Sequence, residues 1–230
     1  MTTIAARLQA VRSRIDAAAR TAGRSSQDIR LIAVSKTFAP AAIAQAHAAG
    51  QTAFGESYLQ EAEAKVGVLP PGLIWHFIGP IQSNKTRQIA ELFHWAHAID
   101  RLKIAERLSS SRPAGLAPLQ ICIQINVSGE ASKSGVGPEE ALALAQAIIP
   151  LSGVRLRGLM AIPEPNPDIG LQRARFRQIR ELKDEIVSRG IALDTLSMGM
   201  SDDLEAAIAE GATLVRVGRA IFGERPLPPA

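Results

Sequence analysis

The sequence predicts an α/β protein, a (β/α)8 barrel of the TIM type, on three observations. Eight short apolar segments rich in β-branched residues alternate with amphipathic helical segments along the 230 residues. That length is typical of a barrel built from such units. No linker-like run divides the chain, so we expect one domain spanning residues 1–230. A doubly wound sheet is the competing architecture, but the even spacing of the segments favours the barrel.

The elements follow one another in a regular order. The predicted strands are 31–35, 52–54, 74–78, 95–99, 119–127, 157–162, 195–198 and 213–217. The predicted helices, which carry apolar residues at helical spacing, include 40–49, 84–93, 102–109, 138–149 and 171–189. An apolar stripe surrounded by arginines also predicts a helix at the N-terminus. An organelle transit peptide has a similar pattern, but this helix leads directly into the first strand, so we interpret it as part of the fold.

Composition narrows the functional class. The net charge is +4, and the arginines are scattered rather than gathered in one block, so we expect no nucleic-acid partner. The single cysteine, Cys122, lies in an apolar run, which excludes an internal disulfide framework and predicts a buried thiol in a reducing compartment. No apolar stretch reaches membrane-spanning length and no secretory signal is recognisable. We therefore expect a cytoplasmic protein without a membrane partner.

Three of the four histidines lie close together in the sequence and raise the question of a metal site. His94 and His97 flank Trp95 on a predicted strand, where their odd separation directs them to opposite faces. No paired carboxylate lies at ligand spacing from them. We expect no metal site, and we interpret His76 as a hydrogen-bonded residue of the core or of the barrel mouth.

Residues 197–225 have the pattern of a phosphate-binding region. Ser201 precedes two acidic residues and a run of helical apolar positions, which predicts that it caps a helix N-terminus. Gly218 follows the strand predicted at 213–217 and allows a tight turn whose amides face an anion. A glycine after a strand is also common in ordinary turns, which is the alternative interpretation.

Lys36 ends the apolar run that forms the first predicted strand. Parallel barrels and open α/β sheets collect their chemistry at the carboxyl ends of their strands. A lysine among apolar neighbours there can act as a nucleophile and form a Schiff base with an aldehyde. A surface lysine that extends its amine into water is the alternative.

Lys36 is one of several polar residues at or near predicted strand ends, where a barrel would bring them to one mouth. They are Lys36, Glu56, His76, Asp100, Asn126, Ser197 and Arg216. This convergence predicts a functional site at the mouth, although single members such as Asp100 also fit the role of a helix cap.

Several long motifs occur in one order along nearly the whole chain. They are IAVSKTF, which contains Lys36, FGESYLQE from Phe54, WHFIGPIQSNKTR from Trp75, INVSGEASKSG from Ile125, GLMAIP from Gly158, and SMGMSDDLEAAIAEGATLVRVGRAIFG from Ser197. With these motifs the chain resembles the pyridoxal phosphate homeostasis proteins, the YggS/PROSC family, which is related to the N-terminal barrel of alanine racemase. The resemblance implies an alanine racemase N-terminal-domain-like barrel that binds pyridoxal 5′-phosphate (PLP).

The resemblance also implies a role for individual residues. Lys36 would hold PLP as a Schiff base, Arg216 would face the pyridine nitrogen, and Ser201 with the amides of Gly218 and Arg219 would receive the phosphate. Residues in the other motifs implied to bind the cofactor are Met160, Ser57 and His76. Ser57 departs from the family pattern, because FGES stands here where FGEN is usual. The role of a side-chain amide near the ring is therefore in doubt, although the Ser57 hydroxyl can keep one hydrogen bond.

We expect a carrier of PLP rather than an enzyme, with little or no turnover. An arginine at the ring nitrogen donates a hydrogen bond and weakens the ring as an electron sink. A racemase needs a second base opposite the lysine, which the related racemase takes from a tyrosine of a separate domain, and only Tyr58 or His76 could replace it here. The alternative is a PLP-dependent fold-type III amino-acid racemase. We expect a monomer whose partners are PLP and PLP-requiring apoenzymes.

Two further segments carry weaker hypotheses. Four arginines between 173 and 180 suit a nucleic-acid or protein interaction module, but a solvated helix face, with acidic residues at 181, 184 and 185 following, is the simpler explanation. The loop 127–136 contains Lys133, which could attract an anion or a second PLP molecule, or could belong to an ordinary solvated loop.

Overall fold

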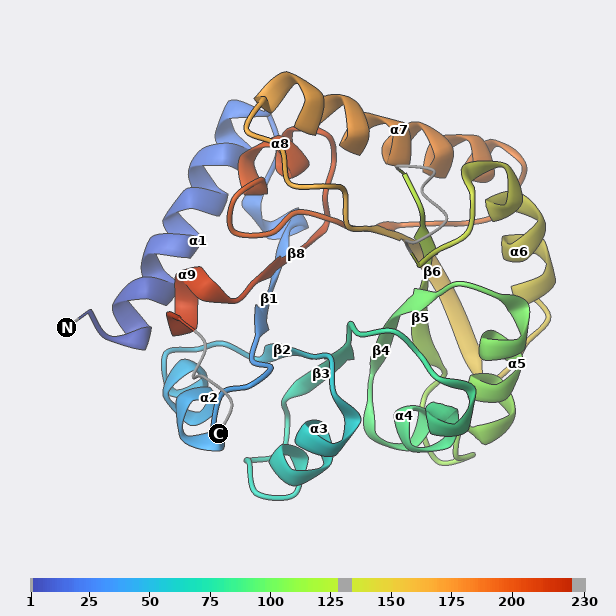
Figure 1. Ribbon diagram of the computed structural model, residues 1–230, viewed down its shortest axis with the longest axis horizontal. Coiled ribbons are helices and arrows are strands. Elements are labelled where there is room, and N and C mark those ends of the chain that lie inside the picture. The colour runs from blue at the N-terminus through green and yellow to red at the C-terminus, as the bar shows by residue number, and fades with distance from the viewer. Residues whose placement is uncertain (1, 128–133, 225–230) are drawn as a thin grey trace.

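The computed structural model describes residues 2–127 and 134–224, and in this part of the chain parallel strands close into a barrel ringed by helices (Figure 1). The strands are β1 Arg30–Val34, β2 Ala53–Glu56, β3 Ile74–Phe77, β4 Trp95–Ile99, β5 Leu119–Ile125, β6 Val154–Ala161, β7 Thr195–Ser197 and β8 Leu214–Val217. Each strand pairs with the next, and β8 pairs with β1. The (β/α)8 barrel predicted from the sequence is confirmed. The Lys133 hypothesis falls outside the described residues.

Helices follow the strands and cover the barrel from outside. They are α1 Ile4–Thr21, α2 Pro40–Ala48, α3 Leu59–Val66, α4 Thr86–Leu92, α5 Leu102–Ser111, α6 Ala141–Ile148, α7 Ile169–Ser188, α8 Leu204–Ala209 and α9 Arg219–Phe222, with short 3-10 turns η1 Ser26–Asp28, η2 Ser83–Lys85 and η3 Pro138–Glu140. Figure 1 shows α1 between α8 and α2, where it completes the ring. The N-terminal arginine-rich helix is therefore a packing element, with Leu8, Val11 and Ile15 buried.

The structure corrects one predicted helix start. Ser201 was expected to cap the helix that follows it, but α8 begins at Leu204 and its N-cap residue is Asp203. The Asp203 carboxylate accepts the backbone N–H of Met200, so residues 201–203 form a turn before the helix. The helices α3 and α9 were not among those predicted.

The barrel interior is packed so closely that one position accepts only glycine. Gly158 on β6 pairs with Thr195 on β7, and a Cβ atom at Gly158 would lie 1.8 Å from the Thr195 carbonyl oxygen. Cys122 on β5 is fully buried, as predicted, and burial raises the pKa of its thiol to about 12. This thiol is therefore chemically inert at neutral pH.

The arginines of α7 have a structural use that the sequence did not reveal. Arg173, Arg177 and Arg180 all pair with Glu210, which follows α8 and is 3% exposed, at distances of 2.8, 3.1 and 3.6 Å. The side chains of these arginines are 38–48% exposed, which agrees with the predicted solvated helix face, but their shared partner comes from another element. Among the described residues, no helix has the length and apolar character needed to cross a bilayer.

Candidate functional site

The loops that follow β1 and β8 lie side by side at the mouth of the barrel. The two strands pair in parallel, with Ala33 opposite Val217. Lys36 comes two residues after β1, and Gly218 comes directly after β8. Strand register thus brings the predicted nucleophile next to the predicted phosphate turn, although more than 180 residues separate them in sequence.

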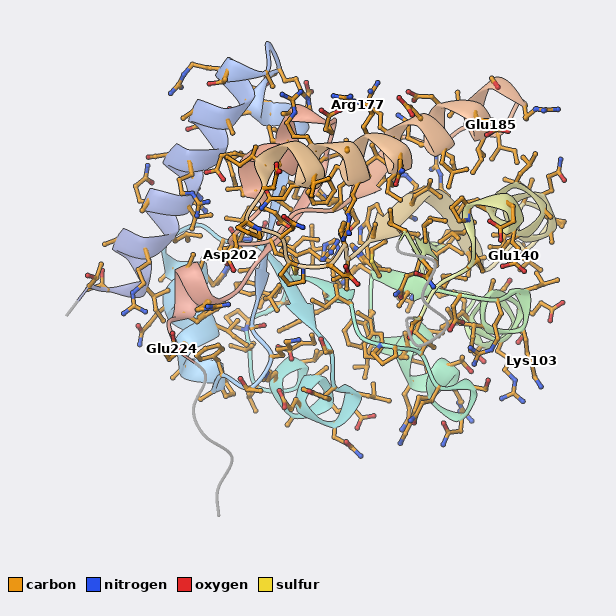
Figure 2. All side chains as sticks on the ribbon, turned by 45° about the horizontal axis from the view of Figure 1, so that its top comes forward. Lys103, Glu140, Arg177, Glu185, Asp202 and Glu224 are labelled. Carbon is orange, nitrogen blue, oxygen red and sulfur yellow. The ribbon has the colours of Figure 1, made fainter. Side chains whose placement is uncertain are left out.

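A cavity of about 500 Å³ opens at this mouth. It is lined by Val34, Lys36, Phe38, Ser57, Ile78, Ile162, Pro165, Met200, Ser201, Asp202, Arg216, Gly218, Arg219, Gly223 and Glu224. The wall includes all but two of the residues predicted to bind a cofactor. Figure 2 shows Asp202 and Glu224 beside α9, at the rim of this cavity.

Arg216 on β8 is fixed by hydrogen bonds to neighbouring strands. Its Nη1 donates to the backbone oxygen and the hydroxyl of Ser197 at 2.6 and 2.7 Å, and Nη2 donates to the carbonyl of Ala161 at 2.9 Å. These bonds use three of the five N–H donors of the guanidinium. Burial lowers the pKa of Arg216 to about 10, so the group remains a cation and a hydrogen-bond donor at neutral pH.

A chain of polar side chains continues from Arg216 into the barrel. The Ser197 hydroxyl lies 2.8 Å from Nδ1 of His97, and Nε2 of His97 lies 2.9 Å from Nδ1 of His76. Both histidines are fully buried, and burial is the main cause that lowers the pKa of His97 to about 3 and that of His76 well below its ordinary value. Nε2 of His76 has no hydrogen-bond partner among the described residues. The two imidazoles are therefore neutral at physiological pH.

Two of the residues predicted to bind the cofactor, His76 and Met160, are not part of the cavity wall. Both belong to strands of the barrel and are buried in its interior, with His76 0% and Met160 1% exposed. Each is the next-to-last residue of its strand, His76 on β3 and Met160 on β6. No group of three or more potential metal ligands stands together in the described part of the chain.

The turn at Gly218 is closely packed against the first strand. A Cβ atom at Gly218 would lie 3.2 Å from the Val34 carbonyl oxygen, so a side chain there would press on β1. Gly218 is also the N-cap of α9, whose first turn contains backbone amides without acceptors inside the helix. Arg219, which is exposed, forms an ion pair of 3.7 Å with Asp202 across the cavity rim.

Glu56 was expected at the mouth, but the structure places it in a buried cluster beneath the Lys36 loop. Glu56 is 0% exposed and accepts hydrogen bonds from the Lys65 ammonium and the Ser35 hydroxyl. Sequence reasoning missed Lys65. The spacing of Glu61 and Lys65, four residues apart on one helix, is a signal for an ion pair, but nothing in it indicates the third partner.

The fold and this site define a class of protein: a parallel barrel with a lysine and a glycine turn side by side at its mouth. A family model described as the N-terminal domain of alanine racemase matches residues 6–226. The alanine racemase of Clostridium difficile has a TM-score of 0.75 at 13% identity and covers 96% of this chain and 57% of its own, which is a likeness of fold alone.

Nearer relatives specify the family. The pyridoxal phosphate homeostasis protein of Pseudomonas aeruginosa is 59% identical over 98% of this chain and 97% of its own length. That of Escherichia coli K12 is 52% identical over 98% of both chains. PipY of Synechococcus elongatus, solved with PLP bound, is 37% identical with a TM-score of 0.85 and covers 96% of this chain and 100% of its own. The chain belongs to the pyridoxal phosphate homeostasis protein family.

Proposed function

We propose that this protein binds PLP in the mouth cavity, attaches it to Lys36, and serves intracellular PLP homeostasis with little or no catalytic turnover. The observation that carries this proposal is the shared cavity, in which Lys36, Arg216 and the Gly218 turn line one space. Membership of the family and the PLP bound to PipY support the choice of cofactor.

The cavity residues fit PLP in size and chemistry. About 500 Å³ is within the range of sites that hold small ligands. The wall contains three cationic side chains, Lys36, Arg216 and Arg219, which suit a phosphorylated aldehyde. When bound, PLP supplies an aldehyde carbon that forms a C=N bond with an amine and releases one water.

At the phosphate end, we assign Ser201, the backbone amides of Gly218 and Arg219, and the first turn of α9 as donors. Amides at a helix start bind anions because they lack acceptors within the helix and lie at the positive end of its dipole. Glycine suits the position before α9, since a Cβ at Gly218 would lie 3.2 Å from the Val34 carbonyl oxygen.

At the ring end, we assign Arg216 as the residue that faces the pyridine nitrogen and Ser57 as a neighbour of the ring. A guanidinium only donates, so it binds a nitrogen that carries a lone pair rather than a proton. The bonds to Ser197 and Ala161 hold the guanidinium in place and keep it from reorienting. This arrangement limits electron withdrawal by the ring, which is what a carrier requires.

The positions of the candidate second bases support a carrier over a fold-type III racemase. Tyr58 is 52% exposed at the start of α3, and His76 is hydrogen-bonded inside the barrel. Neither is part of the cavity wall. We further propose that the chain works as a monomer, because all the residues assigned to PLP belong to the same chain, and that it acts in the cytoplasm, where it delivers PLP to PLP-requiring apoenzymes.

The test of the attachment site is reduction of the PLP-loaded protein with borohydride, followed by peptide mapping. The adduct should map to Lys36, and Lys36→Ala should abolish the visible absorbance band that a lysine-linked PLP gives. Lys103→Ala is the matched control, because Lys103 is exposed on α5, on the opposite side of the molecule from α9 (Figure 2). An adduct on another lysine would contradict the assignment.

The test of the carrier hypothesis is a racemisation assay with purified PLP-loaded protein and single amino-acid enantiomers. We expect no sustained conversion. Turnover at an enzyme-like rate, on the order of 1 s⁻¹ or faster, would replace the carrier with the racemase.

A further inference from the structure

The residue that follows Lys36 is held in an unusual backbone conformation. Thr37 has φ of +69°, and it is the single non-glycine residue with positive φ in the described part of the chain. A threonine in this region is strained, because its branched Cβ crowds the backbone. The Thr37 hydroxyl is buried and has no hydrogen-bond partner among the described residues. Such a conformation persists only where surrounding contacts impose it.

Three ionisable side chains from β2 and α3 supply these contacts. Glu61 accepts the Thr37 N–H through Oε2 at 2.7 Å. Lys65 donates to the Ser35 carbonyl at 3.0 Å, to Oε1 of Glu56 at 2.8 Å and to Oε2 of Glu61 at 3.2 Å. The residues immediately before and after Lys36 are thus bonded to one cluster.

Burying the charges of this cluster costs free energy, which indicates that the cluster does more than fill space in the interior. Lys65 and Glu56 have side-chain exposures of 6% and 0%. Buried ion pairs contribute little net stability, because removing both charges from water offsets their attraction. The second carboxylate oxygen of Glu56 has no partner among the described residues, and burial raises the pKa of this carboxyl group. An apolar pair of similar size would pack there at lower cost.

We propose that Glu56, Glu61 and Lys65 form a clasp that fixes the Ser35–Thr37 backbone and so directs the Lys36 amine into the mouth cavity. These three are positioning residues, since they act on the cofactor through Lys36 and are not part of the cavity wall. The inference rests on the proposed attachment of PLP to Lys36. Under this proposal, the rate at which Lys36 reacts with PLP depends on a cluster of charged residues outside the cavity.

Glu61 is the member whose removal tests the clasp without unfolding the barrel. Its side chain is 34% exposed, and the Lys65–Glu56 pair remains intact without it. Both contacts of Glu61 go to the same oxygen, so the amide oxygen of Glu61→Gln can accept both, whereas Glu61→Ala accepts neither. Glu63→Ala is the matched control, because it removes the same charge from an exposed position of the same helix.

Three measurements on these variants separate positioning from general damage. The first is hydrogen exchange of the Thr37 amide without PLP. The second is the rate at which cyanoborohydride traps PLP on Lys36. The third is the affinity for pyridoxine 5′-phosphate, which has the ring and phosphate of PLP but a hydroxymethyl group in place of the aldehyde.

For Glu61→Ala we expect Thr37 exchange about tenfold faster and trapping about tenfold slower, as loss of a hydrogen bond to a charged group implies. Its affinity for pyridoxine 5′-phosphate should stay within about twofold of the wild type, because the phosphate turn and Arg216 are untouched. Glu61→Gln and Glu63→Ala should stay near the wild type in all three measurements.

Unchanged exchange and trapping in Glu61→Ala would overturn the clasp. An equal loss of trapping and of pyridoxine 5′-phosphate affinity would also overturn it, because the damage would then extend to the whole cavity. Failure of the proposed function looks different, since the wild type itself would give no adduct on Lys36. That result would remove the clasp as well.

Discussion

Acid should destabilise this barrel through His97, and the structure sets the size of the effect. The imidazole is buried among Ser197, Arg216, His76 and Trp95. Its pKa falls from the ordinary 6.5 to about 3, first because burial disfavours the charged form and second because Arg216 is a cation. In the unfolded chain His97 takes up a proton as the pH falls below about 6.5, whereas in the fold it stays neutral until about 3.

The stabilisation is therefore complete above the unfolded pKa and is lost progressively as the pH falls toward the folded pKa. Each pH unit in this window costs about 1.4 kcal/mol, so His97 should remove about 2 kcal/mol of unfolding free energy between pH 7.5 and pH 5. His76 acts in the same direction, because burial and His97 also lower its pKa.

The assay is urea unfolding of the wild type and His97→Asn across this pH range. His97→Asn costs stability at neutral pH, but its unfolding free energy should depend less on pH, so the gap to the wild type should narrow by about 2 kcal/mol at pH 5. Ile123→Val is the control for lost stability itself, because this buried apolar residue does not titrate. Its curve should run parallel to that of the wild type. A gap for His97→Asn that stays constant with pH would refute the reasoning.

Two further predictions concern the framework. Glu210→Gln should lower the free energy of unfolding by about 1 to 2 kcal/mol, because three arginines of α7 lose their shared carboxylate while remaining partly hydrated. Urea unfolding in low and high salt measures this loss, and an unchanged unfolding midpoint would contradict the prediction. Gly158→Ala should prevent folding, because its Cβ would overlap the Thr195 carbonyl oxygen at 1.8 Å. Thermal unfolding followed by circular dichroism tests this, and the variant should show no cooperative transition. A melting curve like that of the wild type would instead show that β6 and β7 can separate.

The order of elements and the place of the lysine could be predicted from the sequence. Apolar periodicity is a local property, and it located the eight strands closely enough to imply a closed barrel. In such a barrel the carboxyl ends of the strands lie on one face, so the sequence alone predicted that Lys36, Ser57 and Gly218 would lie close together. The identity of the cofactor was predicted from the family motifs.

Only the tertiary structure decided how deep each polar residue lies and which partner it meets. His76 and Glu56 occur at strand ends in the sequence, yet His76 bonds to His97 inside the barrel and Glu56 to Lys65 beneath the Lys36 loop. The depth of a strand residue depends on register and barrel stagger, which arise from pairing between distant segments. The contact of Glu210 with the arginines of α7 likewise depends on how α7 and α8 pack on the barrel, and local sequence carries no information about that packing.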